Sequence, residues 1–171
     1  MLFRSNRARR VGKTRFIGYS GDGQAARYAL ECGAFDTLQT SISIADQQSL
    51  SLTLPLAHER QVGVIAKRPI ANAAWRTGDK PVNPYHQAYR ERLQKLDYDF
   101  LGRPLEEGVA IALRFTLSVP GVSTAIVGTT KPERWRQNAA LLAPGPLPQE
   151  LFEVIRRRWS QVAGPDWTGQ A

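Results

Sequence analysis

The segment whose residue types most clearly suit ligand binding runs from Gly128 to Asn138. It follows an apolar run, 123–127. A strand that ends in glycine and hydroxyl residues, and then opens a cationic helix, can bind phosphate through backbone N–H groups, the helix dipole and positive charge. A glycine turn of this kind is also a common helix boundary with solvated charges. The pattern therefore predicts either an anion site or a simple cap. The candidate ligands are Gly128, Thr129, Thr130, Lys131, Arg134, Gln137 and Asn138.

The composition indicates one globular unit and argues against several kinds of site. The 171 residues are 42% hydrophobic and 22% charged, which is enough apolar surface for a core. The apolar runs are far shorter than the roughly 18 residues that a membrane helix needs. Cys32 is the single cysteine, and no histidine lies at metal-ligand spacing from it. We therefore expect no disulfide, no metal site and a cytoplasmic location.

The net charge of +8 is concentrated at the start of the chain. Six Arg and Lys side chains fall within the first fifteen residues, without an acid among them, and they account for most of the excess. Because the rest is nearly neutral, we expect neither nucleic acid nor a membrane as partner, with polyanion binding by this start as an alternative. Residues 1–11 are interpreted as a disordered or truncated start, and 12–171 as the folded domain.

Short apolar runs alternate with patterns of helical period along the rest of the chain. Such alternation requires parallel strands and right-handed crossovers, so the predicted fold class is α/β, with about four parallel strands each followed by helix, plus a C-terminal helix. Strands are expected over 15–20, 35–44, 61–66 and 123–127. A helix is expected over about 25–32, between a glycine turn at 21–23 and Gly33. Further helices are expected from Asp46 with a kink at Pro55, and over 104–117, 132–142 and 148–162.

An insertion at about 71–103 breaks this rhythm and is longer than an ordinary connection. A segment of this length is often functional, such as a lid, but it also carries the pattern of a packing helix. Five apolar side chains share one helical face and are expected to pack over the body. They are Tyr85, Tyr89, Leu93, Leu96 and Phe100.

Taken together, these segments resemble the second half of the aldo-keto reductase family, whose members are (β/α)8 barrels that reduce carbonyl compounds with NADPH. Residues 12–20 are similar to the family's fifth strand, 35–39 to the sixth and 61–69 to the seventh. Residues 112–129 resemble the following helix and the eighth strand. The resemblance covers about 12–162 and implies a partial (β/α)8 TIM barrel.

The resemblance also implies NADP(H) as the cofactor. By position, Ser20 and Gln39 would hydrogen-bond the nicotinamide carboxamide, and 128–138 would hold the adenosine 2′-phosphate and adenine, with Arg134 as the main phosphate ligand. Many members carry an aromatic residue that stacks on nicotinamide where this chain has Lys67 and Arg68. These two cations either reach the pyrophosphate or are solvated at the barrel mouth.

The family's proton-donating Tyr, with its Lys, Asp and His, belongs to the first half of the barrel, for which this chain has no counterpart. Tyr19, Lys67 and Asp36 are suitable residue types, but strand alternation places Tyr19 on the face opposite Ser20. We therefore assign no catalytic residue. His58 and His86 are expected at the surface or in packing.

Four strands alone cannot close such a barrel. We expect an NADP(H)-dependent aldo/keto reductase chain that carries the cofactor-binding half without the catalytic set, and that acts on a small carbonyl substrate only when completed. Completion requires another copy of the chain or a separate first half, unless the chain is a truncation or an incomplete gene model. The alternative function is a non-catalytic module that binds NADP(H) or another anion.

Overall fold

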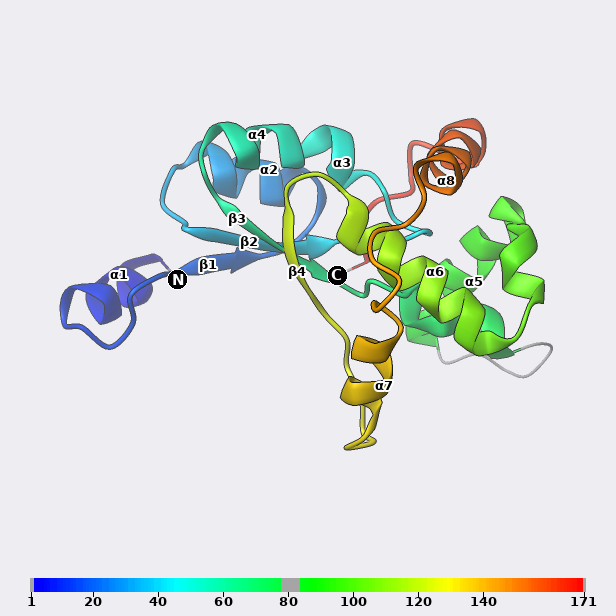
Figure 1. Cartoon of the computed structure of the whole chain (residues 1–171). Coiled ribbons are helices and arrows are strands. Elements are labelled where there is room, and N and C mark those ends of the chain that lie inside the picture. Colours follow the sequence, from blue (N-terminus) through cyan, green and yellow to red (C-terminus); the bar gives the residue numbers. More distant parts are fainter. Residues whose placement is uncertain (1, 78–83, 171) are drawn as a thin grey trace.

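A parallel sheet forms the centre of the computed structural model, which describes residues 2–77 and 84–170 (Figure 1). Its strands are β1 (Gly18–Ser20), β2 (Thr37–Ser41), β3 (Gly63–Lys67) and β4 (Val122–Ile126). They lie in chain order, and every neighbouring pair is parallel. Each strand is followed by helical sequence, and the sheet stays open with β1 and β4 at its edges. The predicted α/β partial barrel is confirmed.

The helices connect the strands as crossovers, and Figure 1 shows α2, α3 and α4 on one face of the sheet. The first two connections contain α2 (Gly23–Glu31), and then α3 (Ser49–Leu52) with α4 (Leu54–Glu59). The third contains the 3-10 helices η1 (Ala71–Thr77) and η2 (Asp99–Gly102), with α5 (Pro84–Leu96) and α6 (Leu105–Ser118). After β4 come α7 (Arg134–Ala140) and α8 (Gln149–Val162).

The two faces of the sheet have different environments because side chains alternate along each strand. Leu38, Val64 and Ala66 point toward the helices and are buried. Ile126 is 47% exposed, although it lies in the sheet. Tyr19 packs against the core, 5.5 Å from the Phe35 ring, which confirms that it faces away from Ser20. The face that would line the interior of a closed barrel is therefore open.

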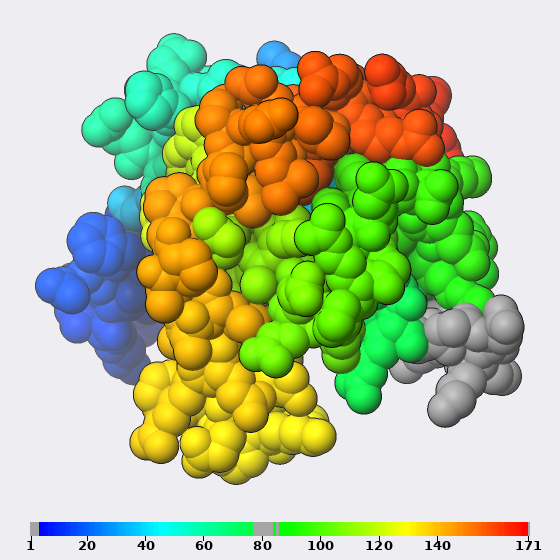
Figure 2. Space-filling view, turned by 45° about the vertical axis from the view of Figure 1, so that its right-hand side comes forward, coloured from blue at the N-terminus to red at the C-terminus, as the bar shows by residue number. Residues whose placement is uncertain are grey.

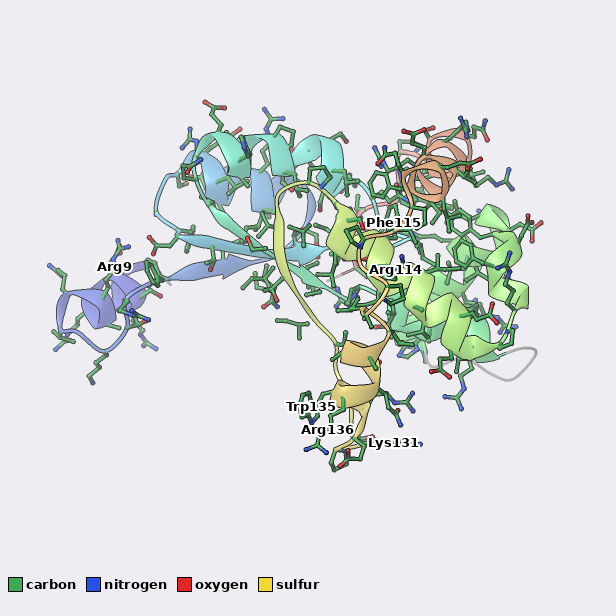
Figure 3. All side chains as sticks on the ribbon, in the orientation of Figure 1. Arg9, Arg114, Phe115, Lys131, Trp135 and Arg136 are labelled. Atoms are coloured by element: carbon green, nitrogen blue, oxygen red, sulfur yellow. The ribbon has the colours of Figure 1, made fainter. Side chains whose placement is uncertain are left out.

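Residues 2–10 form the helix α1 (Leu2–Arg10), where the sequence predicted a disordered or truncated start. Leu, Ala and Arg have high helix propensity, and basic residues in the last turn complement the helix dipole. Arg9 pairs with Asp36 at 3.0 Å, and the same carboxylate accepts the Ile17 N–H. Figure 1 shows α1 projecting beyond the start of β1, and Figure 3 shows Arg9 on it. The helix is thus tied to the amino end of β2.

The connection after β2 differs from the single kinked helix predicted from Asp46. Thr53, with φ −122° and ψ −35°, separates α3 from α4, and Pro55 lies in the first turn of α4, where its missing N–H costs nothing. Asp46 caps neither helix and is buried instead. Cys32 lies at the end of α2 as predicted, but it is exposed.

The insertion packs over the body, as its pattern predicted. Tyr89, Leu93, Leu96 and Phe100 are buried, while the Tyr85 side chain and residues 78–83 lie outside the described part of the chain. The polar side chains of this interface form a buried cluster around one carboxylate. The Tyr89 hydroxyl donates to Asp46 Oδ2 at 3.3 Å, and an Arg92 nitrogen lies 3.9 Å from the same oxygen.

The environment of Asp46 disfavours its charged form. Its side chain is only 1% exposed, and Oδ1 has no hydrogen-bond partner among the described residues. Burial raises the pKa of Asp46 to about 7, against the opposing effect of the Arg92 charge. Burial also raises the pKa of the Tyr89 hydroxyl, so this group stays a donor across the physiological range.

The core prediction concerns Phe115, which is fully buried in α6 and stacks on Phe152 with ring centroids 5.0 Å apart. Phe115→Ala should lower the free energy of unfolding by about 3–5 kcal/mol, because it removes buried apolar surface and leaves a cavity. Urea denaturation measures the change. The matched control is Phe16→Ala, since Phe16 is 63% exposed. An equal loss in the two variants would contradict the assignment of the core.

A second prediction concerns Asp46. Its folded-state pKa lies above the ordinary value of 3.8, so ionising it costs more in the folded chain than in the unfolded chain. Stability is therefore expected to fall as pH rises from about 4 to about 7, by up to roughly 4 kcal/mol for a single site. Asp46→Asn should remove most of this dependence in urea titrations across that range, whereas Asp99→Asn, at an exposed site, should keep it. A wild-type profile that rises with pH would refute the prediction.

Candidate cofactor site

The carboxyl ends of all four strands meet at one edge of the sheet, where ligands of parallel sheets bind. Ser20 is the last residue of β1, and Gln39 lies beside it in β2. The Gln39 amide donates to Ser20 Oγ at 3.3 Å. The structure therefore brings together the two residues that the resemblance places at the nicotinamide carboxamide.

Lys67 ends β3 and is held by an acidic partner 45 positions away. Its Nζ lies 2.7 Å from Asp22 Oδ2, and the Asp22 side chain is only 6% exposed. Asp22 Oδ1 accepts from the Thr40 hydroxyl at 2.9 Å and from the Ser41 backbone N–H at 2.6 Å. The charge of Lys67 is thus largely compensated inside the chain.

Arg68 is the next residue and adopts a left-handed backbone, with φ 55°. Its Nη1 donates to Ser41 Oγ at 3.1 Å and also to the Gln170 carbonyl. Both contacts direct the guanidinium toward the end of β2. Neither of the two cations predicted for the pyrophosphate is a simple solvated charge.

A pocket of about 530 Å³ opens beside these residues, between β2, β3 and β4. Asn72 contributes to its wall, and the Asn72 Nδ2 atom is buried without a hydrogen-bond partner in the described chain. His86 is half-buried and also lines the pocket, which its expected surface or packing role did not anticipate. The pocket residues that could contact a ligand through polar groups are Gln39, Lys67, Arg68, Asn72, His86 and Gly128.

A second pocket, of about 450 Å³, follows β4 and collects positive charge. Of the predicted residues it contains Gly128, Thr129, Thr130, Lys131 and Arg134. Arg76 of η1 also lines it, although no pattern in the sequence predicted this position for Arg76. Among the described residues, none of the three cations forms an ion pair. The pocket therefore has a positive charge that the described part of the chain leaves uncompensated.

The 3-10 helix η1 places Arg76 at this pocket. Ala71, Asn72 and Ala73 all have positive φ, between 46° and 55°, so the chain turns sharply after β3. Trp75 then packs against Gly108 of α6, where a β-carbon would lie 3.4 Å from the indole ring. Because Trp75 is fixed on α6, the Arg76 side chain reaches the segment that follows β4.

The helix predicted over 132–142 is shorter in the structure, because α7 begins only at Arg134 and has seven residues. The preceding residues form a turn in which the Lys131 backbone N–H donates to Thr129 Oγ1 at 3.1 Å. A hydroxyl and an amide expected to bind an anion thus bind each other. The positive side chains, rather than a helix dipole, supply the field of this pocket.

The last predicted residues, Gln137 and Asn138, lie in a third pocket of about 340 Å³. Its other walls are Leu105, Glu106 and Val109 of α6 and Leu141 just after α7. Arg134 lines both this pocket and the cationic one. Thr129 and Asn138 therefore do not share a pocket, and Arg134 connects their two sites. Half-buried Arg134 and Asn138 contrast with Trp135 and Arg136, which are exposed on the same helix.

The exposed side of this segment forms a lobe that extends from the body, drawn in yellow in Figure 2. Figure 3 shows Lys131, Trp135 and Arg136 on it. The Arg136 guanidinium lies over the Trp135 ring, 5.3 Å from its centroid. Arg136 lines neither of the two pockets beside α7.

The three residues that the sequence analysis considered for acid–base chemistry do not lie together. Tyr19 packs among core residues, Asp36 lies at the amino end of β2 with Arg9, and Lys67 is paired with Asp22 at the opposite end. Across residues 2–77 and 84–170, no group of three His, Cys, Asp or Glu side chains is arranged to hold a metal ion. No helix in the same ranges has the length and apolar character of a membrane span.

Comparison with solved structures supports the fold. The holo and apo forms of the aldo-keto reductase AKR11C1 from Bacillus halodurans align with TM-scores of 0.65 and 0.64, at 21% and 20% sequence identity. Each alignment covers 90% of this chain but only 53% or 54% of the other, so the chain spans about half the length of these proteins. No curated protein matches the chain significantly in sequence.

The sequence model of the Aldo/keto reductase family matches residues 6–159. The match begins within α1, so it includes part of the arginine-rich start that the resemblance over 12–162 had left out. It spans all four strands and the helices between them. The chain belongs to the aldo/keto reductase family.

Proposed function

We propose that this chain is the cofactor-binding half of an NADP(H)-dependent aldo/keto reductase, and that Arg76, Lys131 and Arg134 bind the adenosine 2′-phosphate. The observation that supports the proposal is the meeting of three cations without acidic partners in the described chain, in a pocket of about 450 Å³. A phosphate dianion would compensate this charge. Guanidinium groups suit it because they offer a planar fork of donors.

The adjoining pocket fits the adenine part of the same molecule. Leu105, Val109 and Leu141 give it apolar walls, and Gln137 and Asn138 add amide groups at its edge. Arg134 links it to the cationic pocket, as the covalent link between adenosine and its 2′-phosphate requires. NADPH in this seat would be recognised mainly at its adenosine end.

The nicotinamide end would lie at the strand ends, where Ser20 and Gln39 can bind the carboxamide. The buried Asn72 Nδ2 atom, which has no partner among the described residues, offers a donor to the oxygen-rich middle of the cofactor. When bound, the cofactor supplies the hydride for reduction of a small carbonyl compound. We propose that the proton donor comes from outside this chain, so the chain alone binds the cofactor without turnover. The holo form of the Bacillus halodurans reductase is consistent with a cofactor in this fold.

Arg134→Ala tests this proposal. Loss of a charge-assisted contact worth about 1.5–3 kcal/mol should weaken NADPH binding roughly 10- to 100-fold, while NADH, which lacks the 2′-phosphate, should lose less than about threefold. Isothermal titration calorimetry measures both affinities. Arg136→Ala is the matched control, because Arg136 is the same residue type on the same helix but lies outside both pockets. Equal losses for NADPH and NADH would contradict the assigned role of Arg134.

A second candidate function, that of a subunit which closes its barrel with a partner, follows from the two sheet edges. Phe16 precedes β1 and is 63% exposed, while Ile126 in β4 and Trp135 beyond it are 47% and 61% exposed. Open parallel edges with apolar side chains favour strand pairing with further β–α units. A second copy or a separate first half of the barrel would supply them.

If the open sheet edges pair with those of a second copy, the chain should self-associate. Sedimentation velocity at increasing concentration should give species heavier than the 19.0 kDa monomer. Ile126→Asp should shift the distribution toward monomer, because it places a charge on the β4 edge. Val154→Asp is the control, since Val154 is similarly exposed, at 43%, but lies on α8. A single 19.0 kDa species at all concentrations would rule out closure by a second copy.

A further inference from the structure

The segment that follows α8 returns to the sheet and is anchored there by a tryptophan. Trp167 is 6% exposed, and its ring meets that of Trp159 edge-on, with centroids 5.2 Å apart. The Arg92 guanidinium lies over the Trp167 ring, 5.4 Å from its centroid. Figure 1 shows this segment, in red, running from α8 back toward the middle of the molecule. Trp167 thus fixes where the next residues begin.

The next three residues, 168–170, contact polar groups at the carboxyl ends of the strands. Arg92 Nη2 donates to the Thr168 carbonyl at 2.8 Å, and Arg68 Nη1 donates to the Gln170 carbonyl. Between them, Gly169 lies so close to Asp22 that an added β-carbon would overlap the carboxylate. The backbone of 168–170 therefore crosses the place where Asp22 and Lys67 form their ion pair.

Arg68 connects this segment to the proposed cofactor site, because its side chain also lines the pocket of about 530 Å³. The Gln170 carbonyl oxygen accepts a hydrogen bond from Arg68 Nη1. The same N–H group could otherwise donate to a phosphate oxygen of the cofactor. A neutral carbonyl is a weaker partner for arginine than a phosphate, whose hydrogen bonds to a guanidinium are charge-assisted. The contact is therefore one that an anionic ligand can displace.

We propose that residues 168–170 act as a strap that competes with the pyrophosphate and nicotinamide part of NADP(H) for Arg68. This inference rests on the proposed function, and it adds a control of the same site. The strap leaves the cationic pocket at Arg76, Lys131 and Arg134 open, since its contacts within the described part of the chain involve none of that pocket's residues. Ligands that carry only the adenosine end are not affected by it.

The strap should change the apparent affinity for NADPH by a measurable amount. If the strap is seated in nine molecules of ten, the apparent affinity for NADPH is reduced about tenfold, because only the open fraction binds. Linkage requires the reverse effect as well, so bound NADPH must loosen the strap to the same degree. The two effects can be measured independently.

Gly169→Ala tests the strap in the chain of 171 residues. The added methyl group would overlap Asp22 and should expel the strap, so the dissociation constant for NADPH should fall about tenfold. Adenosine 2′,5′-bisphosphate, which lacks nicotinamide and pyrophosphate, should bind with unchanged affinity. Gly102→Ala is the matched control, because a β-carbon there meets nothing within 4 Å. Calorimetry with both ligands measures all three proteins.

A second variant and a second measurement test the strap even if Gly169→Ala does not fold. Removal of residues 168–171 keeps Trp167 and should tighten NADPH binding to the same extent. In the wild-type chain, saturating NADPH should increase deuterium uptake at residues 168–170, whereas the bisphosphate should not. Unchanged NADPH affinity in both variants, or unchanged uptake, with normal bisphosphate binding overturns the strap alone. Absence of bisphosphate binding to the wild-type chain overturns the proposed function and the strap with it.

Discussion

The carboxylate of Asp22 connects the ends of three strands in a sheet that has no ring closure to hold them. It follows β1, accepts hydrogen bonds from Thr40 and Ser41 of β2, and pairs with Lys67 of β3 at 2.7 Å. β1 has only three residues, so its ladder to β2 is short. A buried carboxylate with several donors and one cation therefore joins the ends of these three strands through charge-assisted contacts.

This connection divides the ligand edge of the sheet into two regions of different charge. Around Asp22 the cations have partners inside the chain, since Lys67 is paired and Arg68 donates to Ser41 and Gln170. Beyond β4, Arg76, Lys131 and Arg134 form no ion pair among the described residues. An anionic ligand therefore gains most at the β4 side, and it must replace internal contacts at the β3 side. This asymmetry supports the proposal that a 2′-phosphate binds after the last strand.

Local patterns in the sequence were sufficient to predict the α/β class, because hydrophobic period and turn residues act over short distances. The four strands, helical sequence after each of them and the packing face of α5 were predicted in this way, whereas the helix α1 and the separation of α3 from α4 were not. Contacts between positions far apart in the sequence could not be predicted in this way. The pairing of Lys67 with Asp22, the burial of Asp46 beside Arg92 and the approach of Arg76 to Lys131 all depend on how elements pack. Within the candidate site, Arg134 stays a prediction from the sequence, and a turn between Thr129 and Lys131 stands where the sequence predicted the start of a helix.

A crystal structure of the chain with NADP⁺ bound would show where the 2′-phosphate and the adenine lie. We expect the 2′-phosphate within hydrogen-bond distance of Arg134 and Lys131, close to Arg76, with adenine between α6 and α7. A 2′-phosphate that points into solvent, or adenine seated away from Asn138 and Leu105, would contradict this expectation.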